Sequence, residues 1–82
     1  MRVIEPESLE ALQLAWSEFV PAELREHTRL DGLRRGVLTV TVDSAAHRQE
    51  LDGYVRCGLA QQLAKCWKAR PINQVRLILR SL

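Results

Sequence analysis

The stretch from Arg34 to Leu51 constrains the fold most, because its hydrophobic period changes from that of a strand to that of a helix within eighteen residues: RRGVLTVTVDSAAHRQEL. Apolar residues alternate with threonines from position 38 to position 42, which is typical of a strand with one buried face. Asp43 and Ser44 then offer side-chain oxygens that can accept the free amides of a helix start. The stretch therefore predicts a strand over 37–42 followed directly by a helix.

Further elements are expected on both sides of this stretch. Leucines and aromatic residues at helical spacing predict a helix over 7–19, started by Glu5 to Ser8 and ended by Val20-Pro21 before a short helix over 22–27. A weaker strand over 28–33 forms an antiparallel hairpin with 37–42, because Gly36 can take the positive φ of a tight turn. A long helix then runs from 44 to Arg70-Pro71, with Gly53 and Gly58 allowing close packing or a bend. Alternation over 75–80 predicts a last strand.

This order predicts an α+β fold: a two-layer domain with a three-stranded sheet and helices on one face, in the order α-α-β-β-α-β. The chain has 82 residues, which is enough for one small domain, so residues 1–82 are expected to form a single unit. It contains no apolar run of the roughly 20 residues that a membrane-spanning helix needs, and its start lacks the pattern of a secretory signal. We therefore expect a cytoplasmic protein.

The reactive side chains form no pattern of an enzyme or a metal site. Cys57 and Cys66 would lie about 13 Å apart along one helix and on opposite faces, so we expect them to be reduced and unbonded. His27 and His47 fall in other segments, and the sequence predicts neither a metal site nor a cofactor. No catalytic constellation and no GxxxxGK[ST] phosphate-binding motif is present. We expect no enzymatic activity and no small-molecule substrate.

Charge is distributed unevenly along the chain. Residues 1–27 contain two basic and six acidic side chains, residues 28–52 contain four of each, and residues 53–82 contain six basic and none acidic. Such a basic region attracts polyanions, most plausibly a nucleic-acid backbone, although a solvated helix end gives the same pattern. Trp16 and Trp67 lie on apolar stripes and are expected in the core, so base stacking is not predicted. The candidate nucleic-acid-binding residues are Arg34, Arg35, Lys65, Lys68, Arg70, Arg76 and Arg80.

Several segments together resemble the DciA family of bacterial proteins. They are the GVLTV strand with its Asp-Ser-Ala-Ala break and QEL helix, Trp16 on the first helix, the Leu-x-x-His-Thr run from Leu24, and a closing Val-x-x-Ile strand at Val75. The resemblance covers roughly residues 8–80. It implies a KH-like fold and a non-ATPase module that helps the replicative helicase DnaB reach single-stranded DNA. The chain departs from the family in having His47 where a Trp is frequent, and it lacks the GXXG loop of nucleic-acid-binding KH domains.

Three functions are compatible with these features. The first is a DciA-like, helicase-associated module whose partners are single-stranded DNA and the helicase. The second is an RNA-binding KH-like module. The third is a protein-interaction domain without nucleic acid, in which the last strand is an exposed sheet edge that pairs with a partner.

Overall fold

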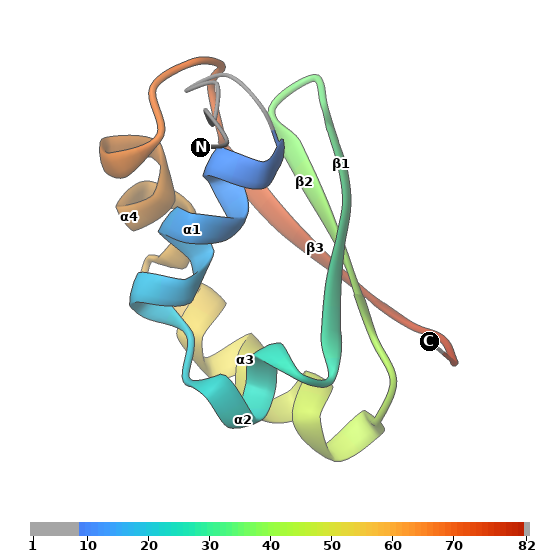
Figure 1. Cartoon of the computed structure of the whole chain (residues 1–82). Coiled ribbons are helices and arrows are strands. Elements are labelled where there is room, and N and C mark those ends of the chain that lie inside the picture. The colour runs from blue at the N-terminus through green and yellow to red at the C-terminus, as the bar shows by residue number, and fades with distance from the viewer. Residues whose placement is uncertain (1–8, 82) are drawn as a thin grey trace, which may run out of the picture.

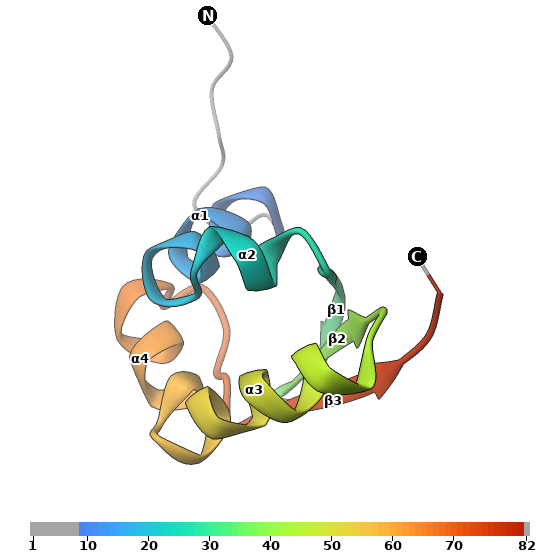
Figure 2. The ribbon, with the colours of Figure 1, turned by 90° about the horizontal axis from the view of Figure 1, so that it is seen from below.

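The computed structural model describes residues 9–81, so the expected helix start at Glu5 to Ser8 lies outside the described residues. The elements are α1 (Leu9–Phe19), α2 (Ala22–Arg25), β1 (Thr28–Arg34), β2 (Val37–Val42), α3 (Ala45–Arg56), α4 (Leu59–Cys66) and β3 (Gln74–Leu79). All three strands form one sheet in the order β1-β2-β3, with β1 and β2 antiparallel and β2 and β3 parallel. The helices lie on one side of this sheet in both views (Figures 1 and 2). The α+β prediction, with a three-stranded sheet covered on one face, is confirmed, and the KH-like classification stays a prediction.

A two-residue turn joins β1 to β2. Arg34 pairs with Val37, and between them Arg35 has a φ of 53° and Gly36 a φ of 78°. Two successive residues at positive φ are typical of a type I′ turn, whose twist matches that of a hairpin. The Gly36 carbonyl also accepts the amides of Asn73 (2.7 Å) and Gln74 (3.1 Å), which attaches the turn to the start of β3.

The single long helix expected after residue 44 is wrong: the structure has two helices, α3 and α4. Gly58 separates them with a φ of 99°, a left-handed conformation that ends a helix and that side-chain-bearing residues rarely adopt. Gly53, in contrast, lies inside α3. The break turns α4 against α1 while α3 stays beside β3 (Figures 1 and 2).

The expected helix cap is also different in detail. Ser44 is the N-cap residue of α3 in extended backbone, but its hydroxyl makes no capping hydrogen bond. The Asp43 carboxylate contacts the His27 ring instead. The helix therefore begins where predicted, without the predicted side-chain contacts.

One hydrophobic cluster lies between the sheet and the helices. Leu38, Val40 and Val42 of β2 are fully buried, as the strand pattern predicts. Trp16 and Trp67 are 3% and 4% exposed, which confirms that both belong to the core. No helix of the described part is long and apolar enough to cross a membrane.

Candidate nucleic-acid interface

Arginine side chains occupy the face of the sheet that points away from the helices. Directly paired residues in a sheet point to the same face, and this face alternates with the buried one along each strand. Arg29, Arg34 and Arg76 pair with positions 41, 37 and 39 of β2, which alternate with its buried leucine and valines. Arg80 follows Arg76 by four residues and so lies on the same face. The amide of Arg80 still bonds to the Val42 carbonyl, which continues the ladder to this position.

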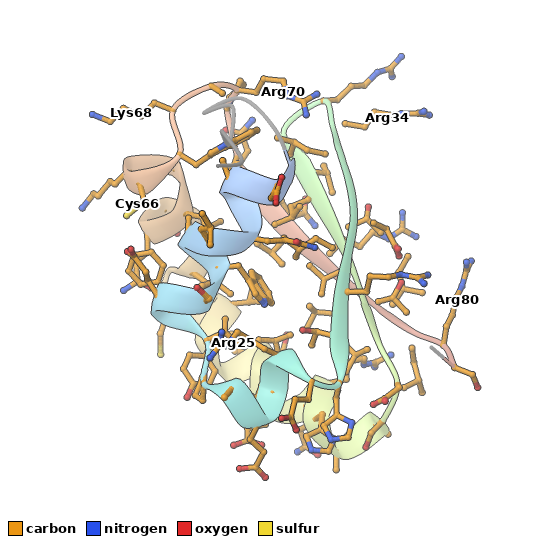
Figure 3. All side chains as sticks on the ribbon, viewed as in Figure 1. Arg25, Arg34, Cys66, Lys68, Arg70 and Arg80 are labelled. Atoms are coloured by element: carbon orange, nitrogen blue, oxygen red, sulfur yellow. The ribbon has the colours of Figure 1, made fainter. Side chains whose placement is uncertain are left out.

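Two further arginines lie at the hairpin turn. Arg35 is exposed at its tip. Arg70, in the connection between α4 and β3, lies with its guanidinium 5.7 Å from the centre of the Trp67 ring. Its Nη1 also donates to the Leu33 carbonyl at 3.5 Å. Figure 3 shows Arg70 extending from the α4–β3 connection toward the hairpin that carries Arg34. We call the six residues Arg29, Arg34, Arg35, Arg70, Arg76 and Arg80 the arginine surface.

Asp31 is a carboxylate within the arginine surface. A bulge between Leu30 and Gly32 shifts the β1–β2 register at this point. The Asp31 carboxylate accepts hydrogen bonds from the Thr41 hydroxyl and from Arg29 Nε, the latter at 3.0 Å. The hydrogen bond from Thr41 has the largest effect and lowers the pKa of Asp31. Burial comes next and opposes it, and the hydrogen bond and charge of Arg29 and the charge of Arg80 lower the pKa further.

The seven residues predicted from the sequence divide into two groups. Arg34, Arg35, Arg70, Arg76 and Arg80 belong to the arginine surface. Lys65 is in the last turn of α4 and Lys68 follows that helix, and Figure 3 shows Lys68 pointing away from the hairpin. Both lysines are exposed. The sequence analysis missed Arg29, because the middle third of the chain is neutral as a whole. The pattern that could have indicated Arg29 is its position next to buried Leu30, because neighbouring residues in a strand point to opposite faces.

Comparison with known protein families identifies the family to which this chain belongs. Residues 1–77 match the family model described as Dna[CI] antecedent, DciA. The chain belongs to the DciA family. No curated protein matches it. Membership of the DciA family implies a role in DnaB helicase loading during replication, and DciA proteins are non-catalytic helicase loaders.

A groove lies along the outer edge of β3 in this DciA-family chain. It has a volume of about 630 Å³ and is formed by α3 and β3. β3 is at the edge of the sheet, so its outer backbone groups have no neighbouring strand among the described residues. Leu79, at one end of the groove, is 45% exposed. The groove is lined by Ala45, Arg48, Gln49, Asp52, Gln74, Val75, Arg76, Leu77 and Leu79.

The free cysteines are separate from these surfaces. Cys57 and Cys66 are exposed and form no disulfide with each other. Cys57 follows α3 and Cys66 ends α4. Neither contributes to the arginine surface or to the groove along β3.

Proposed function

We propose that this chain, as a single domain in the cytoplasm, helps the helicase DnaB to engage DNA by holding single-stranded DNA on the arginine surface. The observation that supports this most is the collection of six arginines on the outer face of the sheet and at its hairpin turn, which come from β1, the turn, the α4–β3 connection, β3 and the residue that follows β3. A guanidinium is permanently charged and can donate two parallel hydrogen bonds to a phosphate. Such a surface suits the nucleic-acid backbone.

The absence of aromatic residues from the three strands indicates how DNA would be held. Both tryptophans are buried, and Phe19 and Tyr54 are on helices. Stacking platforms, which dominate many single-strand binders, are therefore missing from the open face over residues 9–81. Binding should depend on backbone electrostatics, be tolerant of sequence, and weaken steeply with salt.

Fluorescence anisotropy with labelled single-stranded DNA tests this proposal. If about five arginines neutralise phosphates, log K should fall against log salt with a slope of about −3.5. The variant Arg76→Glu/Arg80→Glu should bind at least about tenfold more weakly at near-physiological salt. Circular dichroism would verify that this variant and its control are folded.

Lys65→Glu/Lys68→Glu is the matched control, because it changes the net charge by the same amount at the end of α4, outside the arginine surface. We expect it to retain most of the affinity. A loss equal to that of the arginine variant would show that net charge, rather than the arginine surface, controls binding. Tighter binding to RNA of equal length would favour the RNA-binding alternative.

The groove along β3 favours a second candidate, the protein-interaction function. An extended segment of the helicase could add a strand to β3 and place side chains against α3, as in other domains that bind peptides by strand addition. Ala45 is exposed and lines this groove, so Ala45→Trp should obstruct it without entering the core. Loss of helicase binding with unchanged DNA affinity would support this candidate. Unchanged helicase binding would contradict it.

A further inference from the structure

A cluster of two histidines and one aspartate lies at the end of the hairpin opposite its turn. His27 precedes β1, Asp43 follows β2, and His47 is in the first turn of α3. The Asp43 amide donates to the His27 carbonyl at 3.1 Å, which fixes the two backbones side by side. One ligand atom from each of the three residues lies within 4.8 Å of the others. Positions far apart in sequence, which the sequence analysis assigned to separate segments, are thus neighbours.

One buried polar atom of this cluster has no hydrogen-bond partner among the described residues. His27 Nδ1 lies 3.0 Å and 3.1 Å from the two Asp43 carboxylate oxygens, and the two imidazole rings stack with centroids 4.0 Å apart at 12°. His47 Nδ1 is buried and makes no hydrogen bond to any described residue. A buried polar atom without a partner is unfavourable by about 1–3 kcal/mol. The Asp43 carboxylate satisfies His27 but not His47, so the contacts seen in the cluster do not explain why His47 Nδ1 is buried.

We propose that His27, Asp43 and His47 form a binding site for a divalent transition-metal ion of the zinc class. Two imidazoles and a carboxylate are a donor set that zinc accepts, with water completing the coordination. Ligand atoms about 2.0–2.1 Å from one ion lie roughly 3.3 Å from each other in a tetrahedral site, close to the His27–Asp43 distance. This part of the site already has the required spacing.

The stacked rings define the movement that metal binding requires. A bound ion lies in the plane of each ligating imidazole, so two parallel rings do not both point at one ion. One ring must turn about χ2, a torsion with a broad energy profile. The bound ion would then fasten the start of β1, the end of β2 and the start of α3 to each other. Metal binding should therefore stabilise the fold and change the environment of both rings.

Thermal unfolding with and without zinc tests the site. The protein should carry Cys57→Ser and Cys66→Ser, because exposed thiols also bind zinc. At free zinc ten times the dissociation constant and pH 7.5, we expect the Tm to rise by about 6–11 °C relative to EDTA. Magnesium should give no rise, because its ligands are mainly oxygen atoms.

His47→Gln in the same cysteine-free background should abolish the zinc-dependent rise, whereas Glu50→Gln, an exposed change in the same helix, should keep it. Proton NMR adds a readout that does not depend on stability: zinc should shift the imidazole resonances of both histidines in the folded protein. Equal Tm values in zinc and EDTA together with unshifted imidazole resonances would overturn the proposal. A zinc effect that persists in His47→Gln would overturn it as well.

Discussion

Replacing Arg35 with asparagine should make the protein more stable and its binding to DNA weaker. Arg35 has a φ of 53°, and this left-handed conformation disfavours L-residues other than glycine, asparagine and aspartate by about 1–2 kcal/mol. Arg35→Asn creates the Asn-Gly pair that type I′ turns prefer. The Arg35 side chain makes no hydrogen bond or ion pair with the residues that the structure describes, so the substitution removes neither kind of interaction. We expect a gain of about 0.5–1.5 kcal/mol in the free energy of unfolding.

Two measurements on the same variant test this reasoning. Urea unfolding should show a higher midpoint with an unchanged m-value, since the surface buried on folding does not change. Anisotropy titrations with single-stranded DNA should show a salt slope shallower by about 0.7, which corresponds to the loss of one phosphate contact. An unfavourable backbone conformation at an exposed arginine would then be explained by what its side chain binds.

Arg34→Asn is the matched control, because it removes the same charge one residue earlier. Arg34 belongs to β1 and has extended backbone, where asparagine is unfavourable. The Arg34→Asn variant should therefore be less stable and should also bind DNA more weakly. A stability gain in Arg34→Asn, or no gain in Arg35→Asn, would refute the argument from the turn. Unchanged DNA binding in Arg35→Asn would show that Arg35 does not contact DNA.

Three further substitutions test the fold and its electrostatics. Gly36→Ala should destabilise the protein by about 2 kcal/mol in urea unfolding, because its Cβ would clash with Asn73 Nδ2 and its φ is 78°. Gly58→Ala should lower the free energy of unfolding by about 1 kcal/mol, since φ is 99° there. Asp31→Asn should tighten DNA binding in anisotropy titrations. Because folding lowers the pKa of Asp31, its carboxylate stabilises the protein above about pH 4, and this contribution is lost as the pH falls through the folded pKa. In Asp31→Asn, the free energy of unfolding should therefore fall less steeply as the solution is acidified.

Local patterns in the sequence predicted most of the elements. Alternation over 38–42 gave the buried face of β2, and Gly36 indicated the hairpin. The division of the long helix was not predictable in the same way, because Gly53 and Gly58 interrupt similar apolar patterns. Only Gly58 takes a left-handed conformation, and Gly53 is accommodated within α3. Which glycine ends a helix depends on the packing of α4 against α1, which is a tertiary property.

The candidate sites depended on long-range pairing even more. The parallel pairing of β3 with β2 places Arg76 and Arg80 on the same face as Arg29, and no local pattern specifies that pairing. Lys68 and Arg70 are two residues apart, yet the chain after α4 directs them to different sides of the molecule (Figure 3). The sequence therefore predicted a basic C-terminal third, whereas the fold divides it and adds an arginine from β1.

The form of the arginine surface fits the demands of helicase loading if it is the DNA-binding surface. A loader acts on whatever sequence the replication machinery exposes, so contacts to base edges would be a disadvantage. Arginines on an open sheet face without aromatic residues contact phosphates, which are the same in every sequence. Such binding is also fast and strongly dependent on ionic strength, so that modest competition for the phosphates releases the strand. A screen of unrelated single-stranded sequences of equal length should accordingly give dissociation constants within about threefold of one another. A preference of tenfold or more would require base contacts that the arginine surface does not provide.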